Sequence, residues 1–448
     1  MKTISSIVSL ALFLTLASCS SFAQEGNGSE LAAGEQSTNP KSTRDAKQDQ
    51  ANVGGFGELM PAGWSFGSGY QVLGIFDDNV FGTDSFQESD TISQFSADFS
   101  ALRRTRRAKL EFRYMPEFDV HQHYSPFNSF SQGYAQNVSY ELTRHTDLNW
   151  QLGARTISLR NALPFSFISP QGFAFSPYNP QALQNGVDVR AGNTSLGIEH
   201  RLSKRTRLNV NMLSSVISFS KLGNQSLVGQ PRLDYSDGIE ASIEHDISKE
   251  STIGIQETST YFAFVDPGRH EFLHAVQGTF NRKLGHDFTA QIAAGPSFSQ
   301  GQQFTGRASQ SQGLNYAVDA GLRYQNGPST LFLNFSRGQE LGLVESGITS
   351  ESVTLGGQRT FARRWLASFS GGYSRADSVT ILASTQGLVT TGRLEYRVSD
   401  TLSAVSTYSF FQQRGDNASP IFGRVARNQI GIGFRYIPNW FDHHGRRF

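Results

Sequence analysis

Gln429-Ile-Gly-Ile-Gly-Phe-Arg-Tyr436 is the stretch that decides the fold. Its apolar residues Ile430, Ile432, Phe434 and Tyr436 recur at every second position, so they project from one face of an extended strand. The opposite face carries Gln429, Gly431, Gly433 and Arg435. This alternation predicts a membrane-spanning β-strand, with the apolar face against lipid and the polar face toward a lumen.

The same stretch resembles an assembly signal. Gln429, Gly431, Phe434 and Tyr436 have the polar, glycine and aromatic spacing of the C-terminal signal of bacterial outer-membrane barrels. The resemblance implies two partners, the barrel-assembly machinery and outer-membrane lipid. The usual signal ends at the last residue, whereas a C-terminal tail follows here over 437–448.

The N-terminus predicts export. Lys2 precedes an apolar stretch from Ile7 to Leu16, and small residues follow, as in a secretory signal peptide. Two cleavage sites stay open. Cleavage after Ala23 gives a signal peptide over 1–23, whereas the lipobox-like Leu16-Ala17-Ser18-Cys19 gives one over 1–18 with a lipidated Cys19. Residues 24–63, mostly polar, predict a flexible periplasmic tether.

The composition agrees with a barrel that has one wet and one apolar face. The chain of 448 residues contains 44 Gly and 35 Phe, and its formal net charge is +1. Turns need the glycines and the lipid-facing wall needs the aromatic residues. The balanced charge gives no indication of nucleic-acid binding.

Short and long connections alternate along the chain. Eight short polar turns and nine longer segments are expected, which together join eighteen antiparallel strands over 64–436. We therefore predict an all-β fold, a transmembrane antiparallel up-and-down β-barrel of about 18 strands. The short turns are expected at 102–107, 142–146, 202–208, 247–253, 284–288, 326–329, 361–365 and 398–402; the longer segments at 77–90, 116–130, 159–191, 220–235, 266–270, 300–312, 338–349, 375–385 and 412–425.

The alternation also predicts which side chains face the lumen. Tyr316, Val318 and Leu322 are expected to face lipid, with Asn315 inside. A charge at the lipid midplane costs about 2–4 kcal/mol, so charged residues on the other parity are candidates for the pore lining. They could form ion pairs that stiffen the wall, or a basic lining for a polyanion. The candidates are Lys109, Arg113, Arg155, Glu199, Arg201, Arg207, Glu240, Glu244, Asp319, Arg323, Arg393, Glu395, Arg397 and Arg435.

The longest expected loop, 159–191, is rich in aromatic residues and prolines. Such a loop could fold into the barrel mouth and constrict it, or it could pack on neighbouring loops or on a partner. We expect the constriction, with these rings buried: Phe165, Phe167, Phe173, Phe175 and Tyr178.

No catalytic, cofactor or metal site is predicted. His121 and His123 share one face of a strand with Asp119, but no spacing identifies the further ligands that a metal would need. Serines and histidines are too numerous for a catalytic triad to be chosen without geometry. We therefore do not expect an enzyme.

The opening strand carries a family resemblance. The segment from Gly69 to Phe81, with Asp77-Asp78-Asn79 after an aromatic residue, resembles β-barrel porins of the kind encoded with exopolysaccharide systems. The resemblance implies an outer-membrane channel, with a secreted polysaccharide and periplasmic export components as further partners. A general or nutrient-uptake porin and a non-conducting structural or adhesion barrel are the alternatives.

Overall fold

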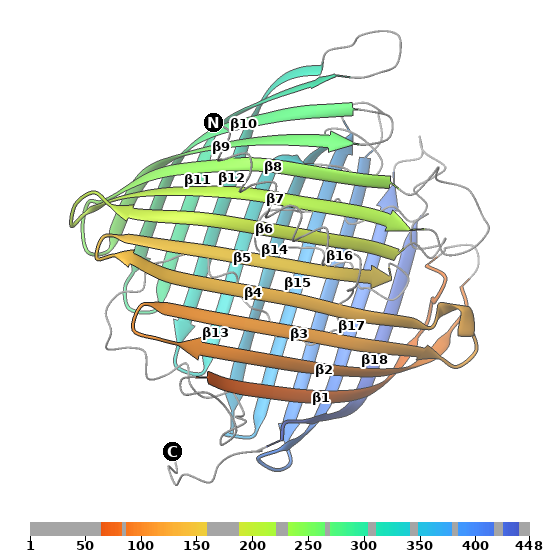
Figure 1. Cartoon of the computed structure of the whole chain (residues 1–448). Helices are drawn as coiled ribbons and strands as arrows, with labels where there is room; N and C mark the ends of the chain where they lie inside the picture. Colours follow the sequence, from red (N-terminus) through yellow and green to blue (C-terminus); the bar gives the residue numbers. More distant parts are fainter. Residues whose placement is uncertain are drawn as a thin grey trace.

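The chain forms a closed antiparallel β-barrel of eighteen strands in the computed structural model (Figure 1). The structure describes residues 64–82, 87–158, 188–220, 232–264, 269–302, 311–340, 348–378, 384–415 and 424–438. Each strand pairs with the next one, and β1 pairs with both β2 and β18, which closes the sheet. The predicted fold class and strand number are confirmed.

The strands have similar lengths, and a single short 3₁₀ helix, η1 (Ser125–Phe127), is found among the described residues. The strands are β1 (Trp64–Asp77), β2 (Asp90–Arg104), β3 (Ala108–His121), β4 (Ser129–Thr143), β5 (Thr146–Ser158), β6 (Asp188–Arg201), β7 (Thr206–Ser220), β8 (Arg232–Asp246), β9 (Ser251–Phe264), β10 (Arg269–Leu284), β11 (Phe288–Gln302), β12 (Ser311–Asn326), β13 (Ser329–Glu340), β14 (Ile348–Phe361), β15 (Trp365–Ser378), β16 (Ser384–Arg397), β17 (Leu402–Gly415) and β18 (Val425–Tyr436).

Short turns lie at one end of the barrel and longer connections at the other. All eight predicted short turns join the strands expected, from β2–β3 to β16–β17. Gly285 and Gly327 have φ of 75° and 50° in two of these turns, a conformation that glycine adopts at little cost. Because the strand number is even, β1 starts and β18 ends at the short-turn end.

Two strands contain a proline, and this corrects one predicted boundary. We expected a loop over 116–130, but β3 continues through Pro116 to His121. Pro116 pairs with Gln132 of β4, whereas the pairing with β2 is interrupted beside it. Pro296 of β11 lies at a similar interruption against β10. A proline has no backbone N–H to donate to one of its two neighbouring strands, so the hydrogen-bond ladder is interrupted on that side only.

The outer face is apolar as predicted. Ile430, Ile432, Phe434 and Tyr436 are all well exposed on β18, and Tyr316 and Leu322 on β12. Their neighbours on the opposite parity face the lumen. Among the described residues, no helix is long and apolar enough to span a membrane.

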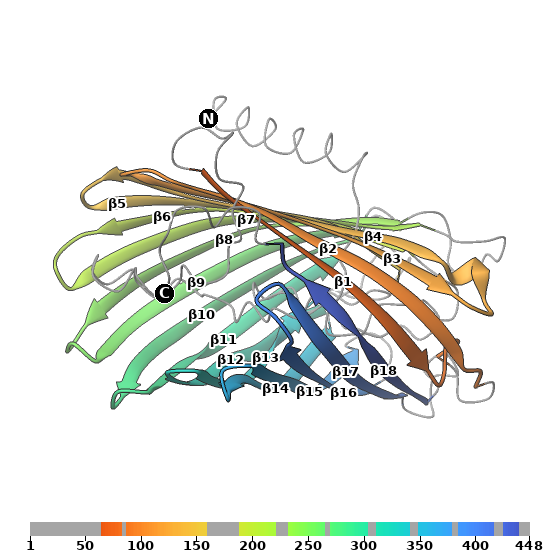
Figure 2. The same ribbon diagram turned by 90° about the horizontal axis from the view of Figure 1, so that it is seen from below.

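Some inward-facing residues are apolar, which the alternation did not predict. Leu73 and Ile75 of β1 pack with Ile92 and Val405 in a buried cluster on the lumen side. A second buried cluster joins Val389, Phe411 and Val425. Both clusters lie near the place where β1 meets β18, two strands that Figure 2 shows side by side. The inner face of the wall is therefore apolar in this part of the barrel.

Candidate functional site

The candidate site is the lumen wall. Strand register places all the predicted lining residues on the face opposite the exposed apolar side chains. Whether they contact a transported solute stays a prediction. The predicted constriction residues, Phe165 to Tyr178, lie outside the described residues, as do Cys19 and the segments 1–63 and 439–448.

At the short-turn end the lining charges form a chain of ion pairs across β5–β8. Arg201 lies 3.3 Å from Asp147 and 3.8 Å from Glu199. Arg207 lies 2.8 Å from Glu244 and 3.5 Å from Asp246. Acids and bases therefore neutralise each other along this wall.

Two further groups of charges lie on the same inward face. Arg113 forms a two-pronged contact with Asp98 of β2, at 3.0 and 2.6 Å, and Lys109 lies 3.2 Å from Glu111. On the other side of β1, Glu395 lies 2.9 Å from Arg393 and 3.7 Å from Arg435. Arg393 also donates to Gln71 of β1 at 2.9 Å, so it reaches over β17 and β18 along the inner wall.

Two of the remaining candidates accept hydrogen bonds from side-chain amides. Asp319 accepts a hydrogen bond from Gln277 at 3.2 Å, and Glu240 accepts one from Asn211 at 3.3 Å. Arg155, Arg323 and Arg397 occupy inward positions on β5, β12 and β16.

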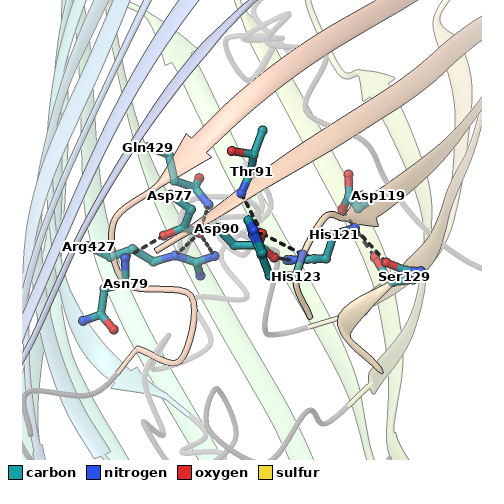
Figure 3. Close-up of polar contacts among 11 residues, drawn as sticks. Asp77, Asn79, Asp90, Thr91, Asp119, His121, His123, Ser129, Arg427 and Gln429 are labelled. Carbon is teal, nitrogen blue, oxygen red and sulfur yellow. Dashed lines mark hydrogen bonds and ion pairs between the residues drawn. The ribbon is translucent and has the colours of Figure 1, made fainter. Parts of the chain in front are cut away.

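A buried polar cluster closes the barrel at the long-loop end (Figure 3). The Asp77 carboxylate, fully buried at the end of β1, accepts hydrogen bonds from Nε and Nη2 of Arg427 and from Nε2 of Gln429, both on β18. The backbone N–H of Asn79 donates to its other oxygen at 3.0 Å, and the Asn79 amide donates to the carbonyl of Ala426 at 2.8 Å. We call this group of Asp77, Asn79, Arg427 and Gln429 the seam cluster.

Next to the seam cluster, the carboxylate of Asp90 contacts two histidines. Asp90 Oδ2 lies 3.0 Å from Nδ1 of the buried His121, and its Oδ1 lies 3.0 Å from Nδ1 of His123. The same oxygen accepts the backbone N–H of His123 at 3.1 Å. These bonds tie the start of β2 to the segment after β3, where Phe81 packs edge-on against Tyr124.

Sequence reasoning missed the acidic and basic partners in this region. Asp77 and Arg427 lie at opposite ends of the chain, but both stand on the inward parity of strands that barrel closure makes neighbours. Charged residues at inward positions of the first and last strands are therefore the sequence signal that could have identified this pair. His121 and His123 do not form a metal site with Asp119; among the described residues no group of three or more His, Cys, Asp or Glu could hold a metal ion.

A second feature that the sequence did not indicate is an uncharged sector of the lumen wall. None of the inward-facing side chains that the structure describes on β13–β15 is charged. Hydroxyl groups are frequent there. Ser336 and Ser352 are 2.7 Å apart, and Ser370 lies 2.6 Å from Thr391 of β16.

Comparisons with known proteins found similarity to solved barrel structures only. No protein-family model matches the chain, and no curated protein matches it. The unliganded ferric citrate transporter FecA superposes with a TM-score of 0.43 and 11% identity, covering 80% of this chain and 61% of the transporter. OpdK of Pseudomonas aeruginosa with vanillate gives 0.39 and 10%, covering 83% and 98%, and OccAB3 of Acinetobacter baumannii gives 0.39 and 9%, covering 83% and 99%.

The fold itself places the chain in a membrane. Its closed sheet leaves no unpaired strand edge, and its outer surface is mainly apolar, which together are what a bilayer requires of a β-protein. An even number of antiparallel strands with short turns at one end is the architecture of bacterial outer-membrane barrels. The chain has the fold of an integral outer-membrane β-barrel.

Proposed function

We propose that this barrel is a porin-like channel through which polar solutes cross the outer membrane. The observation that carries the proposal is the inward face of an eighteen-strand barrel, on which polar and charged groups predominate. Barrels of this size leave an aqueous channel, whereas eight-stranded barrels are filled by side chains. The predicted signal peptide would deliver the chain to the periplasm for assembly.

Uptake or general diffusion of small polar solutes is the form that we favour. The lining arginines that the structure pairs with carboxylates present little net charge to a passing molecule. The uncharged sector on β13–β15 adds hydroxyl groups that could exchange hydrogen bonds with a hydroxylated solute. Both features suit neutral solutes better than a polyanion.

Export of an exopolysaccharide is the second candidate, and it rests on the resemblance of the opening strand. A polyanionic glycan would favour arginines that are not neutralised by neighbouring carboxylates. The seam cluster gives the Asp77-Asp78-Asn79 element of that resemblance a structural role in closing the barrel. The element can therefore be explained without a glycan.

Planar-bilayer recording of the refolded full chain tests the proposal. We expect stable single-channel conductance with weak ion selectivity, and liposome swelling that is faster with small neutral sugars than with sugar acids of equal size. Arg393→Glu should change the ion preference more than the conductance, because it reverses one lining charge beside Glu395. Asn315→Gln, an uncharged inward change on β12, is the matched control.

Absence of conductance from a barrel that shows normal heat-modifiable mobility would refute the channel and favour the non-conducting structural or adhesion alternative. Selective passage of long acidic oligosaccharides, with exclusion of small neutral sugars, would refute uptake and favour export.

A further inference from the structure

A row of charged side chains crosses the lipid-facing surface of five consecutive strands. Strand register pairs Arg337 of β13 with Glu351, Glu351 with Arg375, Arg375 with Gln386 and Gln386 with Arg414 of β17. Residues paired in this way share one face of the sheet. That face is the outer one, because Leu331, Leu333 and Phe335 have the same parity as Arg337 and are exposed. We call these five residues the outer charged row.

The row lies directly beside an apolar one. Two residues closer to the short-turn end, β13–β16 present Phe335, Val353, Tyr373 and Leu388, each paired with the next and each exposed. A lipid-facing arginine is strongly unfavourable at the bilayer midplane but well tolerated near the interface. The change from one row to the other therefore marks the boundary between hydrocarbon and headgroups at the long-loop end.

The row contains three arginines, of which Arg337 is held by two contacts. Arg337 forms an ion pair with Glu351, and its guanidinium carbon lies 4.1 Å from the centre of the Tyr316 ring. Arg375 stands on the other side of Glu351 and is exposed, and Arg414 is exposed at the end of β17. The row thus holds three guanidinium groups and one carboxylate, which gives it a net positive charge.

We infer that the outer charged row binds the phosphate groups of anionic glycolipid in the outer leaflet of the membrane. Long connections face outward in barrels of this type, so the row lies at the level of the outer-leaflet headgroups. Guanidinium groups bind phosphate oxygens through paired charge-assisted hydrogen bonds. Tyr316 and Tyr373 flank the row, as amphipathic rings do at membrane interfaces. The inference goes beyond channel activity and does not depend on conduction.

The test measures lipid binding by the full chain in neutral detergent. Lipid A with its phosphates should raise the temperature at which the heat-modifiable barrel unfolds, and lipid A from which the phosphates have been removed should have a much weaker effect. The double variant Arg375→Gln and Arg414→Gln should bind the phosphorylated lipid roughly thirtyfold more weakly, which corresponds to about 1 kcal/mol for each of the two basic residues removed.

Arg359 provides the matched control. It lies on the outer face of β14 as well, but near the short-turn end, beside Ser329 and Ala367. Arg359→Gln removes one equivalent charge from the opposite membrane boundary and should leave binding of the phosphorylated lipid unchanged.

Equal stabilisation of the wild-type barrel by phosphorylated and dephosphorylated lipid would overturn the inference, and so would equal weakening by the Arg359 variant. If the double variant does not fold, the inference can still be tested on the wild-type barrel by comparing the two lipids at low and high salt. The extra stabilisation by the phosphorylated lipid should decrease at high salt, because a phosphate–arginine contact weakens with salt.

Discussion

Replacing Asp77 with asparagine should weaken the barrel by about 3–5 kcal/mol, the range for breaking a buried ion pair. The Asp77 side chain is fully buried and that of Arg427 is 5% exposed, so water cannot replace the lost contact. The carboxylate oxygen that faces Arg427 also accepts from Gln429 at 2.8 Å. An asparagine side chain would keep the shape of the aspartate but remove the buried negative charge that faces the guanidinium of Arg427.

The pair of Asp98 and Arg113 is the natural comparison. It has similar two-pronged geometry on the same inward face, but its side chains are 30% and 24% exposed. Partly exposed pairs contribute about 0–1 kcal/mol, so Asp98→Asn should cost several-fold less. The double variant Asp77→Asn and Arg427→Gln should recover part of the loss, because no buried charge is then left alone.

Urea unfolding of the refolded variants in lipid vesicles, followed by the mobility shift of unheated samples, measures these differences. A loss below about 1 kcal/mol for Asp77→Asn, or equal losses at Asp77 and Asp98, would refute the reasoning that burial decides the contribution of each pair.

Four further predictions concern single sites. Ile432→Arg should prevent assembly, scored by unheated gel mobility, because this side chain is 68% exposed toward lipid, whereas Asn315→Arg should assemble normally. Gly433→Val should also block closure by the same assay, since a Cβ at this position would overlap the carbonyl oxygen of Val72. Deleting 164–180 should raise single-channel conductance if the loop constricts the pore; unchanged conductance of a folded barrel would favour an external docking surface. Labelled fatty acid should be lost in Cys19→Ser if the lipobox is used, whereas a mature start at Gln24 in mass spectrometry would establish ordinary cleavage.

The strand number and faces could be predicted because they depend on local patterns. Period-two alternation and short polar turns involve residues close together in the sequence, and lipid enforces the partition of charge. The first long connection was predicted at 77–90, and β1 ends at Asp77 while β2 begins at Asp90. Boundaries were wrong where a proline interrupts one ladder but not the other, as at Pro116.

The strand ends near outward-facing charges were harder to predict. The sequence analysis predicted longer segments over 338–349 and 375–385, so it ended β13 just after Arg337 and placed Arg375 at the start of a loop. The structure continues both strands past these charges, to Glu340 and Ser378. The charges are tolerated because they lie beyond the hydrocarbon boundary, which a one-dimensional pattern does not mark.

The seam between β1 and β18 determines the order in which the barrel can form. Seventeen of the eighteen strand pairings join consecutive strands, whereas Asp77 and Arg427 are separated by 350 residues. Hairpins can therefore accumulate early, while the growing sheet keeps two open edges that could pair with other chains. Joining those edges is the step with the largest loop-closure entropy, so it should be the slow and aggregation-sensitive one. Gln429 belongs both to the predicted assembly signal and to the seam cluster. An assembly factor that binds this signal would therefore compete with strand β1 for β18, so the factor must release β18 before the barrel can close.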